Sequence, residues 1–584
     1  MKLLKRQLWI YRGAVAAAIL IKLFATMFEL LLPYILEHII DDVVPQGQMR
    51  AVIGWGALMF LAAFVCRTLN VLANRTAVNN AHRISFDVRQ ALFAKTVNLS
   101  GSQFDAYTLP SLISRMTSDS YNVQSAVQQF QTLFVRAPIM LFGGLLVALT
   151  MDWQLAMILV VMLPFLMGVI LLVSSRGIPL FARVQERLDA VVRIMRENIT
   201  GIRVVKALCK EDYEQEHFAA ANQAMTRQDI AASTVMAIPG PFMQLCLNVG
   251  LTLVVLFGAG RVNAGEIKPG VILAFLTYFN MIAMGVMGLN RIFMTLSRAS
   301  ASADRIDAVL QTQTDQTVLS GTEAARPSGE GFIRFEDVGF RYGEGEGGGA
   351  GFAGEKREKA LDRISFSIPR GGSLGIIGPT GCGKTTIINL LMRFYDASEG
   401  HVFVDGRDVR SYDKDTLRRR FGAVFQNDMI FRDSLRENIA FGRELSDEAV
   451  RAAVEDAMAA EFVDALDEGL DYRAAIKGAN LSGGQKQRLL VARALAADPE
   501  ILVLDDSSSA LDYKTDALMR RAILARHPDA TLIMIAQRVS SVMGMDQILV
   551  MDNGRCIGLG SHEELLKSCE AYREIYKIQM GDMA

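Results

Sequence analysis

An eight-residue run in the second half of the chain has the composition and spacing of a phosphate-binding loop. It reads Gly378-Pro379-Thr380-Gly381-Cys382-Gly383-Lys384-Thr385, with four free positions between the first glycine and the Gly-Lys-Thr ending. Glycines let consecutive backbone N–H groups curl around phosphate oxygens, because a Cβ would obstruct that curl. In this pattern Lys384 reaches the β- and γ-phosphates and the Thr385 hydroxyl ligates Mg²⁺. The run therefore predicts a nucleotide site that uses Mg²⁺.

The segments on either side of the loop fit the same interpretation. The apolar run 374–377 is typical of a buried strand, and the run 386–394, which begins at Thr386, has a helical pattern. The N-terminus of that helix would face the anion. Because strand, loop and helix follow in the required order, a chance match by a glycine-rich turn explains the run poorly.

A second anion site is predicted further along the chain. In Leu481-Ser482-Gly483-Gly484-Gln485, a hydroxyl and bare backbone N–H groups stand at the start of a helical pattern that continues to Ala497. One chain does not need two phosphate cradles for one nucleotide. We therefore expect the second cradle to serve the ATP that another subunit holds.

An acidic residue and an aromatic residue complete the predicted site. The apolar run 501–504 ends at Asp505, which we expect to hold Mg²⁺ mostly through water. Tyr342 follows the alternating pattern 333–338 upstream of the loop, where its ring could stack on adenine. The predicted ligands are ATP and Mg²⁺.

The composition divides the chain into an apolar first half and a soluble second half. The 584 residues carry a net charge of −1, which gives no basic signal for nucleic acid. Hydrophobic residues make up 51% and the mean hydropathy is +0.24, an excess that lies in the first half. The six cysteines have no paired spacing, which argues against a zinc site or a disulfide framework.

Six apolar runs are long enough to span a membrane. They lie at about 14–36, 52–73, 133–151, 155–173, 235–259 and 271–293. The first run is too long for the core of a signal peptide and lacks a small-residue cleavage site. Basic residues precede the first run and crowd the long connections 74–132 and 174–234. The positive-inside rule therefore places both termini and both connections in the cytoplasm.

The two long connections are too long for structureless loops and are nearly free of proline. Two small cytosolic domains would explain them. We favour membrane helices that continue into the cytosol in pairs, each pair closed by a short turn. Turn-forming residues at 102–107 could close the first pair, and the second turn is expected near 202–213.

Polar residues inside the predicted spans are candidates for a cavity wall. Lys22 and Glu29 are seven residues apart on the first run and therefore share a helix face, and Arg67 lies on the second run. Such groups usually face a bundle interior or a water-filled cavity. Snorkelling to the membrane interface is the alternative, and it stays open for Lys22 and Arg67. Glu29 and Asn280 are the candidates for a substrate cavity.

The domain boundaries follow from composition. A linker at 313–330, rich in Thr, Gly, Ser and Pro, separates a transmembrane domain at 1–312 from a soluble domain at 331–584. Within the soluble domain, the segment 343–354 is mostly Gly and Glu, which indicates a flexible insertion for which we find no chemistry.

With these motifs in this order, the full-length chain resembles an ATP-binding cassette (ABC) transporter of the exporter type. More closely, it resembles one half of a bacterial heterodimeric multidrug exporter. The run 481–485 matches the family signature, which is far more specific than a phosphate loop alone. The resemblance implies an α-helical exporter-type transmembrane domain with six spans and cytosolic helix extensions, followed by an α/β P-loop NTPase (ABC) domain.

The resemblance also assigns individual residues. Tyr342 takes the adenine-stacking position, and Gln426 is the glutamine that contacts Mg²⁺ and senses the membrane domain. Ser509-Ala510-Leu511-Asp512 is the D-loop. The family implies that two such domains enclose two ATP molecules, each between the phosphate loop of one chain and the signature of the other. Closing this sandwich is expected to turn an inward-facing cavity outward, and hydrolysis resets it.

Two positions depart from the family pattern. The residue after the Mg²⁺ aspartate is normally a glutamate that acts as general base, and here it is Asp506. Its carboxylate is one methylene shorter, about 1.5 Å, although a base must lie within about 3 Å of its proton or use an extra water. The switch histidine after the strand 531–536 is replaced by Gln537, which carries no charge and cannot shuttle a proton. His527 and His562 cannot substitute for it by position.

Together the departures predict the degenerate site of a heterodimer. This chain would bind ATP tightly and hydrolyse it poorly, and its signature would complete a competent site on a homologous half-transporter that carries the glutamate and the histidine. The rival is a homodimer with slow, aspartate-driven hydrolysis. We expect export of small amphipathic, drug- or lipid-like molecules across the plasma (inner) membrane. Two alternative functions are uptake by an exporter-like fold and an ATP-gated channel or regulator.

Overall fold

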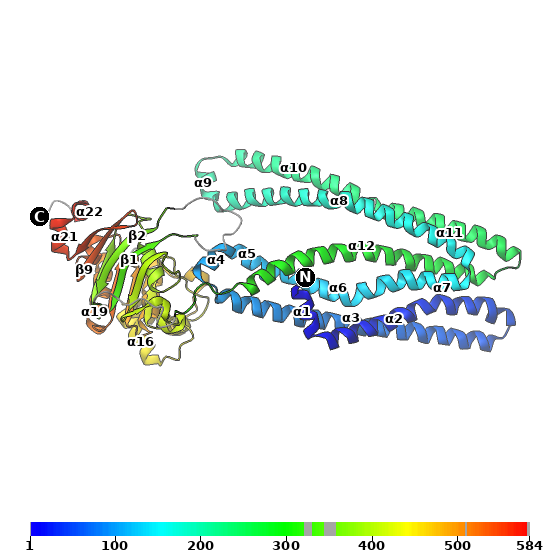
Figure 1. Cartoon of the computed structure of the whole chain (residues 1–584), viewed down its shortest axis with the longest axis horizontal. Helices are drawn as coiled ribbons and strands as arrows, with labels where there is room; N and C mark the ends of the chain where they lie inside the picture. Colours follow the sequence, from blue (N-terminus) through cyan, green and yellow to red (C-terminus); the bar gives the residue numbers. More distant parts are fainter. Residues whose placement is uncertain (1, 320–329, 344–357, 508–510, 581–584) are drawn as a thin grey trace. The chain divides into compact units, whose positions relative to one another are not determined.

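The computed structural model describes residues 2–319, 330–343, 358–507 and 511–580. The chain folds into two compact units (Figure 1). One comprises Met1–Val97 and Leu112–Thr312, and the other comprises Asn98–Ser111 and Gln313–Ala584. The segment 98–111, which lies inside the predicted transmembrane domain, thus belongs to the second unit. Much of the predicted linker (320–329) and most of the predicted insertion (344–354) lie outside the described residues.

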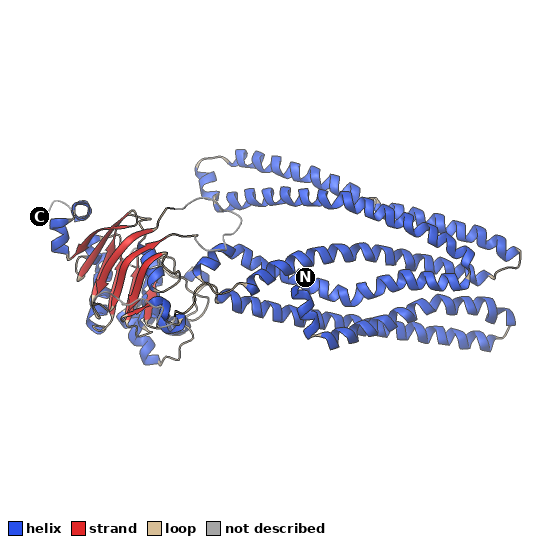
Figure 2. Ribbon diagram, in the orientation of Figure 1, coloured by secondary structure: helices blue, strands red, loops and turns tan. Residues whose placement is uncertain are grey.

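The first unit is built of helices throughout its described residues (Figure 2). Its helices, with α5 at the boundary between the units, are α1 (Lys2–Ile10), α2 (Arg12–His38), α3 (Met49–Val97), α5 (Leu109–Ser114), α6 (Ser120–Pro138), α7 (Gly144–Met151), α8 (Trp153–Thr200), α9 (Ile202–Ala207), α10 (Glu211–Ala237), α11 (Pro239–Asn263) and α12 (Pro269–Gln311). Single π-helical turns at Ile39–Val43, Arg115–Asp119 and Ile139–Gly143 interrupt this pattern.

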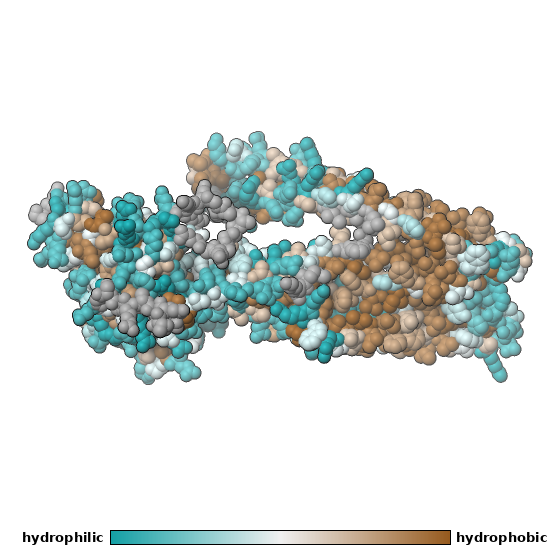
Figure 3. Space-filling view, viewed as in Figure 1, coloured by the Kyte–Doolittle hydropathy of each residue, from teal (hydrophilic) through white to brown (hydrophobic). Residues whose placement is uncertain are grey.

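Five helical segments in the described residues are long and apolar enough to cross a membrane. They are Arg12–Gln46, Met49–Val97, Leu109–Met151, Glu211–Asn263 and Pro269–Gln311, and they contain five of the six predicted spans. Helices suit this role because a bilayer core offers no water to the backbone polar groups. The remaining predicted span, 155–173, is not confirmed, because the described apolar stretch in α8 is Trp153–Val169 and a span needs about 20 residues. The space-filling view shows the apolar surface of this unit as a band next to a hydrophilic end (Figure 3).

Several helices continue well beyond their apolar stretches, as expected. α3 is unbroken over 49 residues and α8 over 48 residues. α3 packs along α6, and α8 packs along α10. The short helices α4 (Gly101–Tyr107) and α9 stand where the chain reverses between the members of each pair. The prediction of long paired helices is therefore confirmed, and the predicted turns are themselves short helices.

The second unit combines two sheets with surrounding helices. The strands are β1 (Ile333–Phe340), β2 (Leu361–Ile368), β3 (Ser373–Ile377), β4 (Glu399–Val404), β5 (Arg407–Asp408), β6 (Phe421–Val424), β7 (Ile501–Asp505), β8 (Thr531–Ile535), β9 (Gln547–Asp552) and β10 (Arg555–Gly560). The helices besides α4 are α13 (Lys384–Leu391), α14 (Lys414–Arg418), α15 (Leu435–Ala440), α16 (Asp447–Asp456), α17 (Ala460–Asp464), α18 (Gly483–Leu495), α19 (Tyr513–Arg526), α20 (Val539–Val542), α21 (His562–Ser568) and α22 (Glu570–Met580).

The strand order of the larger sheet positions the site. This sheet runs β10-β9-β3-β8-β7-β6, and the five strands from β9 to β6 are mutually parallel. β8 lies between β3 and β7, so the carboxyl ends of these three strands meet at one edge, where ligands bind in open α/β sheets. The smaller sheet, β2-β1-β4-β5, is antiparallel.

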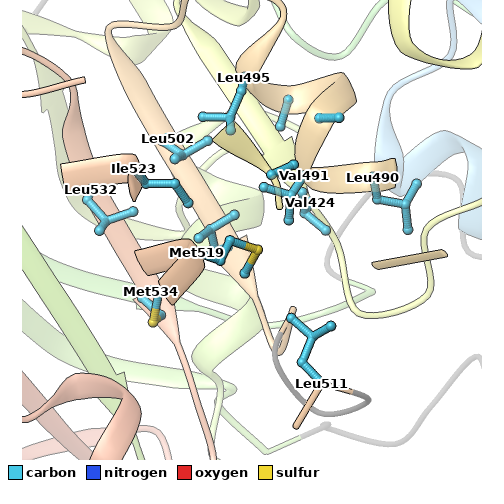
Figure 4. Packing of buried hydrophobic residues seen from close by; sticks show 14 of the residues in the cluster. Val424, Leu490, Val491, Leu495, Leu502, Leu511, Met519, Ile523, Leu532 and Met534 are labelled. Carbon is cyan, nitrogen blue, oxygen red and sulfur yellow. The ribbon is translucent and has the colours of Figure 1, made fainter. Parts of the chain in front are cut away.

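Apolar side chains fix the strands of the larger sheet against their helices. β7 is buried at all five positions, as expected for a central parallel strand. Figure 4 shows Leu502 of this strand in one cluster with Val491 and Leu495 of α18 and Met519 and Ile523 of α19. Leu504, next to Asp505 at the end of β7, belongs to the same core, which therefore fixes the strand that leads to Asp505 and Asp506.

Candidate functional site

The phosphate-binding loop follows β3 and leads into α13, as predicted. Gly381 and Gly383 have φ angles of +85° and +98°, a region that residues with a Cβ rarely adopt. A Cβ on Gly378 would lie 2.3 Å from the carbonyl oxygen of Met551. The Lys384 ammonium lies over the loop and donates to the carbonyl oxygens of Gly378 (2.8 Å) and Pro379 (2.7 Å). These three glycines are therefore required by the shape of the loop.

The expected Mg²⁺ ligands lie together. The Thr385 hydroxyl donates to Oδ2 of Asp505 at 2.8 Å, although the two residues are 120 positions apart. Burial raises the pKa of the Asp505 carboxyl, against the hydrogen bond from Thr385. A cation would offset this cost of burial, and oxygen donors are the ligands that Mg²⁺ prefers. The donor set therefore fits Mg²⁺ held jointly by the protein and by phosphates.

The two residues that depart from the family pattern contact one another. Asp506 follows β7 with φ of +50°, and Gln537 follows β8. Nε2 of Gln537 donates to Oδ2 of Asp506 at 2.9 Å. Burial raises the pKa of the Asp506 carboxyl, and hydrogen bonds from Gln537 and Gln426 and the charge of Lys384 oppose this shift. The side chains of Gln426 and Gln537 thus both contact the carboxylate of Asp506, and three candidate residues from three loops lie together.

The candidate for adenine stacking lies beside the start of α13. Tyr342 stands in the turn after β1, and its hydroxyl lies 3.1 Å from Oγ1 of Thr386. Nδ2 of Asn389 donates to the same hydroxyl at 3.3 Å. The ring also contacts Tyr395 edge-on, with a centroid distance of 5.3 Å. The position of the ring is therefore fixed, and its role toward adenine stays a prediction.

The signature run forms the exposed start of α18. Ser482 caps this 13-residue helix: the Gln485 N–H donates to the Ser482 hydroxyl at 3.3 Å, and the Ser482 N–H donates to Oε1 of Gln485 at 2.8 Å. Ser482 and Gly483 are exposed, and Gly484 and Gln485 are half-buried. A helix N-terminus carries partial positive charge and offers backbone donors to anions. The predicted second cradle is thus open to the surroundings of the unit.

Part of the predicted D-loop can be placed. Asp512 caps α19 and accepts a hydrogen bond from the Thr515 N–H at 2.9 Å. Ser509 and Ala510 lie outside the described residues.

The polar residues of the predicted spans are held within the helix bundle of the first unit. Lys22 is 4% exposed and donates to the amide oxygens of Asn70 (2.7 Å) and Asn74 (3.2 Å), so it does not snorkel. Glu29 accepts a hydrogen bond from Arg136 at 2.7 Å, which makes an ion pair between α2 and α6.

Two further polar residues of the spans are exposed. Asn280 donates to the Leu276 carbonyl of its own helix at 3.0 Å. Arg67 is exposed as well, so the snorkelling alternative stays open for it. The cavity role of Glu29 and Asn280 remains a prediction.

We did not predict that α4 packs against Phe394 and Tyr395 within the nucleotide-binding unit. The Gly101 N–H donates to the Phe394 carbonyl at 3.0 Å, and the Tyr395 hydroxyl donates to Asp105 at 2.7 Å. Since Tyr395 also contacts Tyr342, a series of contacts connects the adenine-stacking candidate to α4. The aromatic pair Phe394-Tyr395, directly after the phosphate-loop helix, could have indicated a contact surface. Nothing in the sequence indicated that α4 would pack on it.

Replacing Gly101 with valine should release α4 from this contact. A Cβ at Gly101 would lie 2.7 Å from the Tyr395 ring and 2.8 Å from the Phe394 carbonyl oxygen. Because such overpacking costs about 1–3 kcal/mol, we expect amide exchange across 98–111 to rise about tenfold or more, measured by hydrogen-exchange mass spectrometry. Gly544→Val is the matched control, since a Cβ there would meet no atom within 4 Å. Unchanged exchange in Gly101→Val would show that this contact does not hold α4.

Comparisons with known proteins agree with the fold. Residues 15–286 match the ABC transporter transmembrane region and residues 361–509 match the ABC transporter family. The uncharacterized ABC transporter ATP-binding protein YfiB of Bacillus subtilis is 34% identical over 565 residues, which cover 97% of this chain and 96% of that protein. The ATP-dependent lipid A-core flippase of Vibrio vulnificus is 28% identical, with coverage of 99% and 98%.

A solved structure supports the same fold. It is the structure of a bacterial Atm1-family ABC exporter with ATP bound, and it superposes with a TM-score of 0.81 over 98% of this chain and 100% of that chain. At 23% sequence identity, this likeness shows the fold. The chain therefore belongs to the ABC transporter family, as a multi-pass membrane protein whose transmembrane region and ATP-binding domain are fused in the fold of an exporter.

Proposed function

We propose that this chain is one half of a heterodimeric exporter and that its own ATP site binds nucleotide but hydrolyses it slowly. The observation that carries the proposal is the 2.9 Å hydrogen bond from Gln537 to Asp506, at the two positions where the family pattern has a switch histidine and a catalytic glutamate. The phosphate loop, Thr385 and Asp505 keep the family pattern. Binding and hydrolysis are therefore separable at this site.

Slow hydrolysis follows from what each of the two side chains can do. A general base must reach the proton of the attacking water, and the Asp506 carboxylate is about 1.5 Å shorter than a glutamate. Its Oδ2 already accepts a hydrogen bond from Gln537. The Gln537 amide has no titratable proton to relay. Thr385, Gln426 and Asp505 would hold Mg²⁺, which neutralises phosphate charge when it is bound.

The signature of this chain would serve a partner. Ser482 and Gly483 are exposed at the start of α18, where backbone donors can receive an anion from outside the unit. We propose that they complete the ATP site of a homologous half-transporter that carries the glutamate and the histidine. In this assembly most hydrolysis takes place at the partner's phosphate loop.

One observation favours a slow homodimer instead. Burial raises the pKa of Asp506, and a raised pKa makes its carboxylate a stronger base once it is deprotonated. In a homodimer Asp506 would act as the base in two identical sites. We rank this function second, because the hydrogen bond from Gln537 engages the same carboxylate.

The proposed substrate is a small amphipathic molecule, drug- or lipid-like, that is exported across the plasma (inner) membrane with both termini on the cytoplasmic side. Support comes from the exporter fold and from the basic residues of the two long connections. Uptake and ATP-gated regulation are alternatives. ATP-dependent accumulation against a gradient in inside-out vesicles would support export, and its absence would favour an alternative.

The test of the heterodimer begins with the chain purified alone in detergent. We expect negligible ATP turnover alone and robust turnover in a one-to-one complex after co-expression with a candidate half-transporter, with particle size measured in both samples. Robust turnover by this chain as a homodimer would overturn the proposal, because Asp506 would then be an adequate base.

A further inference from the structure

The C-terminal helix α22 reaches the switch position through one side chain. Nε2 of Gln579 donates to the backbone carbonyl of Gln537 at 2.9 Å. Oε1 of the same amide accepts a hydrogen bond from the backbone N–H of Val539 at 2.7 Å. One amide therefore bridges two backbone groups on either side of Arg538, between the end of β8 and the start of α20.

The helix that carries Gln579 is itself firmly held. Tyr572 lies seven residues earlier on α22 and therefore on the same face, and it is fully buried. Its hydroxyl lies 2.8 Å from Nδ1 of His562, and α22 packs against α20. Gln579 itself is exposed near the end of α22, and its two hydrogen bonds connect this end of the helix to the switch position.

The bridge constrains the residue that contacts Asp506. The Gln537 side chain reaches the Asp506 carboxylate across 2.9 Å, and its direction is set by the backbone from which it leaves. An amide that holds the Gln537 carbonyl and the Val539 N–H together fixes that backbone on both sides. Removing the amide would leave the side chain free to point elsewhere.

We propose that Gln579 is a positioning residue for the ATP site, acting on the switch position through its backbone. The residue lies 42 positions after Gln537 and outside every nucleotide-binding motif. The inference rests on the ATP site of the proposed function, but not on whether that site is slow. An ordinary packing role for the end of α22 is the rival explanation, and it predicts no effect on turnover.

Three variants of the full-length chain separate these explanations. Gln579→Met removes both hydrogen bonds at nearly the same side-chain length. Gln579→Glu keeps an acceptor for the Val539 N–H and loses the donor to Gln537. Lys577→Ala removes a neighbouring exposed side chain of the same helix and leaves both bonds in place. The thermal midpoint of each variant shows whether the chain stays folded.

The first measurement is hydrogen exchange at the Val539 amide, which does not depend on activity. We expect exchange at Val539 to rise about tenfold in Gln579→Met, because the Val539 N–H loses its acceptor there. Exchange should stay the same in Lys577→Ala, which keeps that acceptor. Gln579→Glu should remain close to the parent chain. Unchanged exchange in Gln579→Met would overturn the proposal.

The second measurement is ATP turnover at this chain's site, in the Asp506→Glu/Gln537→His background and in a complex whose partner chain carries a glutamine in place of its catalytic glutamate. We expect kcat to fall about three- to tenfold in Gln579→Met with KM for ATP unchanged, an intermediate fall in Gln579→Glu and no fall in Lys577→Ala. Raised exchange with unchanged kcat would show a purely structural contact and overturn the proposal. If the unsubstituted chain already turns over rapidly, the proposed slow site fails, and the same comparison in that chain decides on Gln579.

Discussion

Changing Asp506 to glutamate and Gln537 to histidine together should raise ATP hydrolysis at this chain's own site by about ten- to a hundredfold. A positioned general base typically contributes a factor of about 10²–10⁴, and the present aspartate is about 1.5 Å short of the family position. The histidine restores a titratable group where an amide now binds the carboxylate at 2.9 Å. The measurement is ATPase turnover of the complex whose partner chain carries a glutamine in place of its catalytic glutamate.

Two single variants separate the effects of the two substitutions, and a third variant serves as a matched control. Asp506→Glu alone should recover part of the gain, because the base is restored but Gln537 remains beside it. Gln537→His alone should recover less, because the carboxylate stays short. Asp529→Glu, the same change at an exposed position of the same unit, should have no effect. If the double variant shows no gain, the slow site has another cause and the degenerate-site proposal fails.

The motifs of the site could be predicted from the sequence because each belongs to a local pattern. A strand, a glycine-rich loop and a helix in succession predicted the environment of Lys384 and Thr385, and an apolar run before an aspartate predicted the place of Asp505. The long helices followed from apolar runs that continue into proline-poor segments. These inferences need only residues that are close together in the sequence. The spacing of apolar side chains and the backbone preferences of such residues determine their local structure.

Contacts between distant segments could not be predicted in the same way. Gln537 meets Asp506 because β8 lies between β3 and β7, and strand order is not encoded in any single run. Likewise, the bridge from Gln579 to the switch position depends on where α22 packs, and α4 docks on Phe394 and Tyr395 through partners far apart in sequence.

Placing an aspartate at Gly483 should reduce ATP turnover of the complex by about a hundredfold or more, although this chain's phosphate loop is unchanged. The new carboxylate would stand at the exposed start of α18, where the proposal places the phosphates of the partner's nucleotide. Two unit charges 4 Å apart at an effective dielectric constant of 20 repel by about 4 kcal/mol, enough for such a loss. The fold should persist, because an acidic residue in the first turn of a helix is stabilising.

Comparing Gly483→Asp with Lys384→Met in the same chain distinguishes the heterodimer from the homodimer. If hydrolysis occurs mainly at the partner's phosphate loop, Gly483→Asp removes nearly all turnover, whereas Lys384→Met weakens only the slow site and costs much less. In a homodimer every site needs both residues, so the two variants would be equally damaging. Turnover of the purified complex, with the thermal midpoint as a check on folding, therefore assigns hydrolysis to one phosphate loop or to both. Equal losses would contradict the proposed division of labour between the two sites.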